Sequence, residues 1–182
     1  MQVFLLLGFI EDNYKMNSKK NVQHVYLVGA KSLGAYGGYE TFVYKLTEYH
    51  QNNENIKYHV ACKANGDGCM DESKFEGVTK LNSHEFEFHN AHCFKINVPQ
   101  IGSAQAIYYD VAALKRCCEH IRKNHISHPI VYIMACRIGP FASHFYRKIH
   151  QIGGTVYLNP DGWKDIIWLN QKTPHKYSVL TA

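Results

Sequence analysis

The sequence predicts an α/β protein: a Rossmann-like, doubly wound and mainly parallel sheet with helices on both faces. Short apolar runs alternate along the chain with stretches of helical periodicity, and one run, residues 129–135, is apolar throughout. A continuously apolar run is typical of a parallel strand that is buried on both faces. Strands that alternate with helices of about ten residues or more form right-handed βαβ units.

The first βαβ unit is predicted around a glycine-rich loop. An apolar strand over residues 25–28 leads into this loop, which begins at Gly29. Apolar side chains then recur with helical spacing, which predicts an amphipathic helix over residues 39–51. A second short strand is predicted over residues 56–61.

The middle of the chain contains three further strand candidates and the clearest helix. The strands are predicted at residues 78–81, 86–88 and 93–98, and the alternation in the middle one suggests a strand at the edge of the sheet. Apolar side chains then recur at spacings of four, three, four and three residues, which predicts a long helix. These side chains are Ile107, Val111, Leu114, Cys118 and Ile121.

The last part of the predicted domain repeats the strand-helix-strand pattern. The buried strand at residues 129–135 turns into a helix with Pro140 at its first position, and Gly153 and Gly154 end that helix. Residues 155–158 form one more strand. The buried face of the helix is predicted to contain Phe141, Phe145, Ile149 and Ile152.

We predict a single α/β domain over residues 22–162. Residues 1–21 are interpreted as an N-terminal extension that is non-native before Met16, because Met16 precedes a polar segment and the first convincing strand. The opening apolar stretch is too short to span a bilayer and has no signal-peptide features. Residues 163–182 are interpreted as a divergent or truncated tail.

Composition narrows the classes of partner and cofactor. The chain has 182 residues and a formal charge of +5, but its basic residues are dispersed, so we expect no nucleic-acid partner. The six cysteines form no Cys-x-x-Cys pair, which favours reduced cytosolic thiols. A zinc site at His84, His89, His92 and Cys93 was the one metal candidate, but its spacings fit no familiar pattern, so we expect no metal and no cofactor.

The glycine loop is the first candidate binding segment, with Gly34, Gly37, Gly38 and Glu40 as candidate residues. Backbone N–H groups at such a loop and the positive end of the next helix favour an anion. The spacing fits neither a P-loop nor a dinucleotide fingerprint, which argues against an NTPase and an oxidoreductase. A glycine-rich turn without a ligand remains an alternative, and Glu40 either accepts from a sugar hydroxyl or only compensates the helix dipole.

Two more candidates follow later strands. Ligands of doubly wound sheets bind beyond the carboxyl ends of the strands, where Arg137 and Asp161 are both predicted to lie. Arg137 either holds a phosphate or carboxylate or forms a surface salt bridge. Asp161 either contacts an acceptor hydroxyl or only forms a tight turn.

These segments together resemble the N-terminal domain of bacterial polysaccharide rhamnosyltransferases, which are family 4 glycosyltransferases of the two-lobed GT-B type. The likeness covers residues 22–162. The segments that carry it are Val28-Gly29-Ala30-Lys31, Tyr36-Gly37-Gly38-Tyr39-Glu40-Thr41-Phe42-Val43, Tyr58-His59-Val60-Ala61-Cys62, Ala135-Cys136-Arg137-Ile138-Gly139-Pro140-Phe141 and Leu158-Asn159-Pro160-Asp161-Gly162.

The resemblance implies transfer of rhamnose from a dTDP-sugar donor to a lipid-diphosphate-linked sugar acceptor, in exopolysaccharide or capsule synthesis. It implies a cytoplasmic location with peripheral contact at the inner face of the cell membrane, and no required metal. In GT-B enzymes the N-terminal lobe mainly holds the acceptor, while the other lobe holds most of the nucleotide sugar. We therefore expect this chain to be the acceptor-side lobe and to be inactive without a second lobe.

Two departures from the family pattern limit the resemblance. The segment after residue 162 differs from the usual family sequence, which suggests a frameshift or truncation near residue 163. Glu40 and Glu48 have the spacing of a second-lobe family motif, but they lie in the wrong lobe, so no catalytic residue is assigned. The alternative is a nonenzymatic remnant, or a partner-binding half that needs a second lobe in trans.

Overall fold

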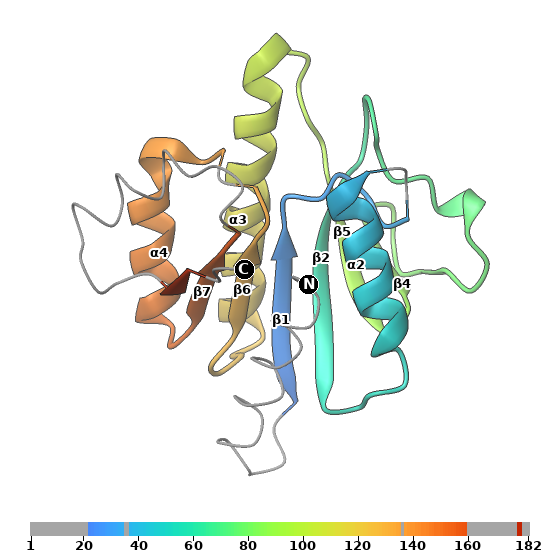
Figure 1. Cartoon of the computed structure of the whole chain (residues 1–182), viewed down its shortest axis with the longest axis horizontal. Helices are drawn as coiled ribbons and strands as arrows, with labels where there is room; N and C mark the ends of the chain where they lie inside the picture. Colours follow the sequence, from blue (N-terminus) through green and yellow to red (C-terminus); the bar gives the residue numbers. More distant parts are fainter. Residues whose placement is uncertain (1–21, 35–36, 136, 160–177, 180–182) are drawn as a thin grey trace.

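In the computed structural model, the described residues form one mixed sheet of eight strands in the order β3-β4-β5-β2-β1-β6-β7-β8 (Figure 1). The structure describes residues 22–34, 37–135, 137–159 and 178–179. The strands β5, β2, β1, β6 and β7 are parallel to one another, while β4 pairs antiparallel with β5. The predicted α/β class with a doubly wound, mainly parallel sheet is therefore confirmed.

The elements follow one another closely along the chain. The strands are β1 (Gln23–Val28), β2 (Ile56–Lys63), β3 (Thr79–Lys80), β4 (Glu85–Phe88), β5 (Ala91–Ile96), β6 (Ile130–Ile133), β7 (Thr155–Leu158) and β8 (Ser178–Val179). The α-helices are α2 (Gly38–Tyr49), α3 (Gln105–Lys123) and α4 (Ala142–Gln151), and the short 3₁₀ helices are η1 (Glu72–Lys74), η2 (Gly102–Ala104) and η3 (Gly139–Phe141).

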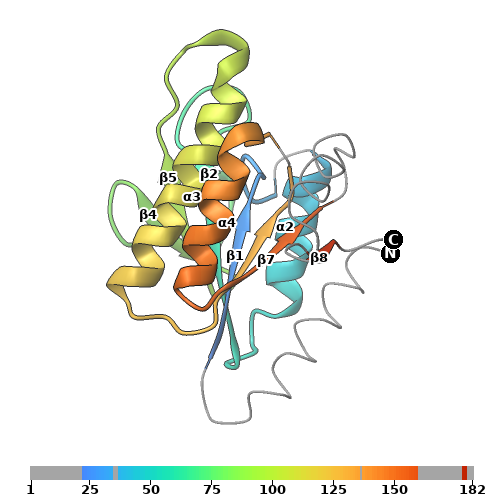
Figure 2. The same ribbon diagram turned by 90° about the vertical axis from the view of Figure 1, so that its left-hand side faces the viewer.

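The sheet separates two apolar cores. Helix α2 covers one face and helices α3 and α4 cover the other, as Figure 2 shows. Along β1, Val25 and Leu27 belong to the core under α2, while Tyr26 and Val28 belong to the core under α3 and α4. Successive side chains of a strand point to opposite faces, and both faces are covered, so residues 25–28 of β1 are fully buried.

The strand at residues 86–88 was predicted to lie at an edge, and this prediction is wrong. It forms β4, which pairs with β3 on one side and with β5 on the other. Phe86 and Phe88 are buried, while Glu85 and Glu87 are half-buried, so the alternation comes from one apolar face packed on the core. The strand at that edge is the exposed two-residue β3.

The helix after β6 begins later than predicted. Gly139 and Pro140 form the 3₁₀ turn η3, and α4 starts only at Ala142. Phe145 and Ile149 are buried as expected, but Phe141 lies in the preceding turn and is 48% exposed. The predicted buried face is thus correct within α4 and wrong at Phe141.

The strand order shows where the chain changes the direction in which it adds strands to the sheet. From β1 the chain first builds outward to β2 and β5, and later returns to the other side of β1 with β6 and β7. The loops that leave β1 and β6 therefore diverge to opposite faces at one point of the sheet, which is where doubly wound folds bind ligands. Among the described residues, no helix is long and apolar enough to cross a membrane.

Candidate functional site

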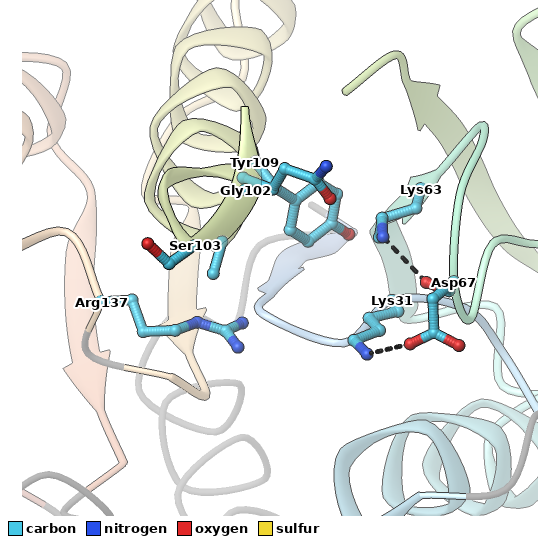
Figure 3. A pocket seen from close by; sticks show the side chains of 9 residues that line it. Lys31, Lys63, Asp67, Gly102, Ser103, Tyr109 and Arg137 are labelled. Atoms are coloured by element: carbon cyan, nitrogen blue, oxygen red, sulfur yellow. Dashed lines mark hydrogen bonds and ion pairs between the residues drawn. The ribbon is translucent and has the colours of Figure 1, made fainter. Parts of the chain in front are cut away.

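A cavity of about 260 Å³ lies at the carboxyl ends of the central strands, beside the point where the sheet reverses (Figure 3). We call it the cleft. Its walls come from the loop after β1, the end of β2 and the loop that follows it, the start of α3 and the loop after β6. The lining residues are Lys31, Lys63, Asp67, Gly102, Ser103, Gln105, Ala106, Tyr109 and Arg137.

Two lysines form one wall of the cleft. The Lys31 ammonium lies 3.0 Å from Oδ2 of Asp67, and the Lys63 ammonium donates to the backbone carbonyl of Asp67 at 2.8 Å. The hydrogen bond from Lys31 lowers the pKa of the Asp67 carboxyl. Asp67 is 94% exposed, whereas Lys63 is 7% exposed. The lining therefore contains three cationic side chains and one carboxylate, and that carboxylate is in water.

Arg137 forms the opposite wall. Its Nε donates to Asp110 Oδ2 at 2.9 Å, and its Nη2 donates to Asp110 Oδ1 at 3.3 Å and to the Gly29 carbonyl at 3.2 Å. The guanidinium thus joins the loops after β1 and β6 to helix α3. Figure 3 shows it directed across the cleft toward Lys31. Within the described part of the chain, its Nη1 group donates no hydrogen bond.

Asp110 holds Arg137 from inside the protein. Its side chain is fully buried, and this burial raises the pKa of the carboxyl, while the hydrogen bonds from Arg137 oppose the change. A buried carboxylate is costly without a partner, so Arg137 and Asp110 stabilise each other as a pair. Arg137 therefore makes an ion pair with a buried partner, not the surface salt bridge considered from the sequence, and it also lines the cleft.

Tyr109 forms the floor of the cleft. Its hydroxyl lies 2.5 Å from the Ala30 carbonyl and 2.9 Å from the Ala61 carbonyl, and both carbonyls accept from it. The side chain is buried, and it ties the ends of β1 and β2 to the first turns of α3. Helix α3 continues directly from η2, because the Gln105 N–H donates to the Gly102 carbonyl. Residues of both helices line the cleft, so the positive dipole end of this helical segment lies beside it.

The three candidate glycines have different surroundings. At Gly34, where φ is +77°, a Cβ would lie 2.7 Å from the Phe75 ring and 2.8 Å from Tyr44, so this glycine permits close packing inside the protein. At Gly37, a Cβ would lie 2.2 Å from Oε2 of Glu40. At Gly38, a Cβ would meet none of the described atoms within 4 Å. Of the three, only Gly38 leaves space for a group from outside the chain.

Glu40 orders the glycine loop from within. It is 9% exposed, and its Oε1 accepts a hydrogen bond of 2.8 Å from the backbone N–H of Lys31. Its own backbone carbonyl accepts from the N–H of Gly34 at 3.4 Å. Glu40 thus fixes the backbone that carries Lys31 toward the cleft.

Comparison with known proteins gives one family. Residues 22–179 match the sequence profile of a family described as a domain of unknown function, DUF1972. The chain belongs to the DUF1972 family. No curated protein matches this chain.

The DUF1972 match spans the fold from β1 to β8, so it includes the whole central sheet and the cleft. It also extends beyond residue 162, where the sequence analysis ended the domain. Strand β8 lies in this additional part and pairs in parallel with β7.

The predicted site residues occupy different places in this domain. Of the described candidates, Arg137 lines the cleft. Gly34 and Gly37 lie in the loop before α2, and Gly38 and Glu40 lie in the first turn of α2. Asp161 lies outside the described residues.

Sequence reasoning missed Lys31, Lys63 and Tyr109, along with the start of α3. The sequence did contain a signal for the two lysines. Lys31 lies shortly after the apolar strand β1, and Lys63 is the last residue of the apolar strand β2, so both lie at the ligand-binding edge of the sheet.

Proposed function

We propose that this DUF1972 chain is the acceptor-side, N-terminal lobe of a GT-B glycosyltransferase. In this proposal it serves transfer of rhamnose from a dTDP-sugar to a lipid-diphosphate-linked sugar and depends on a second lobe for turnover. The observation that carries the proposal is the cleft, where three cations surround a cavity at the reversal point of the sheet.

The chemistry of the cleft suits a diphosphate. Lys31 and Lys63 are compact positive charges, and the start of α3 adds its positive dipole end on a neighbouring wall. The guanidinium of Arg137 is held in place by Asp110, so little side-chain entropy is lost when a ligand binds its outer edge. A diphosphate is shared by the donor and the lipid-linked acceptor, and the charge of the cleft matches both.

An exposed apolar surface beside the cleft supports a lipid-linked acceptor. Ile101, Ile107 and Tyr108 lie just before and within the first turn of α3 and are 47%, 45% and 44% exposed. In Figure 1 this end of α3 extends beyond the sheet. Apolar side chains next to a cationic cleft are suited to a ligand with an anionic head and an apolar chain, and to peripheral contact with an anionic membrane surface.

Binding of the acceptor is the direct test. We expect the full chain to bind a short-chain polyprenyl diphosphate-glucose in calorimetric titration more tightly than it binds dTDP-rhamnose. Lys63→Ala should weaken acceptor binding at least tenfold, because Lys63 lines the cleft. Lys80→Ala, which removes an exposed lysine on the edge strand β3, should leave affinity unchanged. Equal affinity in wild type and Lys63→Ala would overturn the proposed site.

Gly38 gives a second test that leaves the protein's own packing intact. A methyl group there meets no atom of the described residues within 4 Å, so Gly38→Ala should fold normally. If the glycine loop approaches the diphosphate, this variant should bind the acceptor several-fold more weakly than wild type. Unchanged affinity would remove the glycine loop from the site while leaving the cleft.

Turnover separates this proposal from its alternative. The chain alone, given dTDP-rhamnose and the glucose-linked acceptor, should transfer no rhamnose, because the resemblance assigns most donor contacts to the second lobe. Transfer by the chain alone would overturn the half-lobe interpretation. A chain that binds neither substrate would instead favour the nonenzymatic remnant or partner-binding half.

A further inference from the structure

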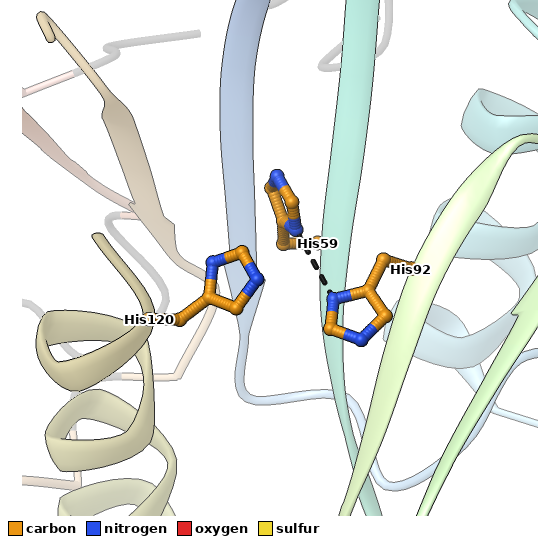
Figure 4. A group of neighbouring side chains, drawn as sticks. All are labelled: His59, His92 and His120. Carbon is orange, nitrogen blue, oxygen red and sulfur yellow. Dashed lines mark hydrogen bonds between the residues drawn. The ribbon is translucent and has the colours of Figure 1, made fainter. Parts of the chain in front are cut away.

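Three histidines from separate elements meet at the opposite end of α3 from the cleft. His59 on β2, His92 on β5 and His120 on α3 direct their rings toward one another (Figure 4), and one nitrogen of each lies within 4.8 Å of the others. We call these residues the histidine cluster. His92 also belonged to the zinc candidate weighed from the sequence, but His84, His89 and Cys93 are not in the cluster.

The spacing within the cluster fits a metal ion. Nδ1 of His59 and Nδ1 of His92 are 3.4 Å apart. Two imidazole nitrogens that each lie about 2.0–2.1 Å from one tetrahedral zinc ion are about 3.3–3.4 Å apart. These two nitrogens are therefore already at the separation of two zinc ligands, and His120 reaches them from the helix above the sheet.

Two of the three rings are hydrogen-bonded through their other nitrogen, and the third faces a carboxylate. Nε2 of His59 lies 2.8 Å from Nδ1 of His24, and Nδ1 of His120 lies 2.8 Å from the Tyr26 hydroxyl. Nε2 of His92 lies 3.8 Å from Oε2 of Glu85. Ligating histidines usually donate their second N–H to such partners, which fixes the tautomer and the ring orientation.

These outer partners identify the ligand atoms. Suppose that His59 and His120 donate through the nitrogens described above, and that His92 carries its proton on the Nε2 that faces Glu85. The unprotonated nitrogens are then Nδ1 of His59, Nδ1 of His92 and Nε2 of His120. All three then present lone pairs to the centre of the cluster. One tautomer of each ring thus directs its N–H to the outer partner and leaves its other nitrogen free to bind a metal ion.

We propose that His59, His92 and His120 bind one Zn²⁺ ion through these three nitrogens, with water as the fourth ligand. Neutral imidazoles are suitable ligands for Zn²⁺. The Glu85 carboxylate beside His92 is itself paired with Arg116. The ion would join β2 and β5 to the C-terminal half of α3, so its role is to fix the helix against the sheet. His59 is 3% exposed, whereas the half-buried His92 and His120 leave a path for the water.

The competing arrangement is a cluster of neutral imidazoles joined by hydrogen bonds, in which His59 and His92 share one proton across the 3.4 Å contact. Stacking of His59 on Tyr26, with ring centroids 4.4 Å apart, supports the cluster in either case. Only the metal proposal predicts a saturable site with nitrogen ligands.

The test uses the full chain stripped with a chelator and then titrated with Zn²⁺ in a calorimeter. We expect one Zn²⁺ per chain and a higher thermal unfolding midpoint in its presence, because an ion that binds only the folded state stabilises it. His120→Gln and His92→Gln should each weaken Zn²⁺ binding at least tenfold and abolish the rise in midpoint. His144→Gln, which removes an exposed histidine of α4, should change neither.

X-ray absorption spectroscopy of the zinc-loaded wild type identifies the ligand atoms directly, so the proposal can be tested even if a variant fails to fold. Three imidazole nitrogens and one further light atom around the ion would support the proposal. Sulfur in the coordination shell would place the ion on cysteines and overturn it. Absence of stoichiometric Zn²⁺ binding, or equal binding by His120→Gln, would also overturn it and leave the neutral imidazole cluster. None of these outcomes depends on glycosyl transfer or on the cleft.

Discussion

The cleft and the histidine cluster lie at opposite ends of the same helix, α3, and they hold polar groups against the sheet in opposite ways. In the cleft, Arg137 is charged and balanced by the buried Asp110, and Lys31 is balanced by Asp67. In the cluster, burial lowers the pKa of His59 to about 2 and of His120 to about 4, so the rings are neutral at pH 7. Arg137 and Lys31 in the cleft thus each have a partner of opposite charge, whereas His59 and His120 under α3 are neutral.

The difference follows from strand register. Tyr26, His59 and His92 are neighbours across β1, β2 and β5, so their side chains share the face that α3 covers. The cleft residues instead follow strand ends, where chain segments separate and leave a cavity. Buried positions beside α3 therefore favour neutral side chains, and positions open to the cavity favour charged ones. Substitutions test the cleft, and a change of pH tests the histidine cluster.

The largest effect is expected from Arg137→Ala. Removing one member of a buried ion pair typically costs about 3–5 kcal/mol, and partial exposure of Arg137 places the expected loss near the lower limit, about 3 kcal/mol. Urea denaturation at pH 7 measures it. Arg147→Ala, at an exposed arginine of α4, should change the free energy of unfolding by no more than about 0.5 kcal/mol.

A double-mutant cycle measures the energetic coupling between Arg137 and Asp110. Asp110→Ala combined with Arg137→Ala should destabilise the protein by clearly less than the sum of the single changes, because the second substitution removes the group that the first left unpaired. Additive single effects would show that the two side chains are not energetically coupled.

Acid should weaken the fold through the histidine cluster. The folded-state pKa of His59 lies far below the ordinary value of 6.5, so between these values the unfolded chain binds more protons and stability falls as the pH falls. From pH 7 to pH 5, His59 alone should cost about 2 kcal/mol of unfolding free energy. Burial also lowers the pKa values of His24, His92 and His120, which act in the same direction.

This second effect is measured by urea denaturation across pH 5–7 in the presence of a chelator. The surface carboxylates with lowered pKa values, such as Asp67 and Asp71, have ordinary values of 3.8 and titrate below this window in both states. A stability that is constant or rises as the pH falls from 7 to 5 would contradict neutral, buried histidines.

Tyr109→Phe is expected to have a smaller effect, about 1–2 kcal/mol. The substitution leaves the carbonyls of Ala30 and Ala61 without their buried hydroxyl partner while it preserves the ring. Tyr108→Phe is the matched control, because this neighbouring tyrosine is 44% exposed and should lose almost nothing. Equal thermal unfolding midpoints for the two variants would show that Tyr109 does not hold the strand ends together.

The sequence predicted most of the fold because periodicity is a local property. The apolar stripe of α3 and the continuous run of β6 each identify their element from adjacent residues. The loop after β6 could also be assigned to the ligand-binding edge, which brought Arg137 into the candidate site.

The rest depended on strand order and register. Lys31 and Lys63 belong to one cleft only because β1 and β2 are neighbours in the sheet. His59, His92 and His120 are far apart in the chain, and no local spacing indicates that β2, β5 and α3 bring them together. The internal role of Glu40 was also hidden, because its hydrogen bond to Lys31 depends on how the glycine loop folds back.

The smallest effect tests that loop through two adjacent glycines. A methyl group at Gly37 would overlap the Glu40 carboxylate, so Gly37→Ala should displace it, break its hydrogen bond to the Lys31 N–H, and cost about 1 kcal/mol. Gly38→Ala adds the same methyl group one residue later, in open space at the first position of α2, and should be neutral or slightly stabilising because it restricts the unfolded chain. Chemical denaturation of the two variants side by side measures the difference. A larger loss in Gly38→Ala than in Gly37→Ala would mean that Glu40 does not order the loop beside the cleft.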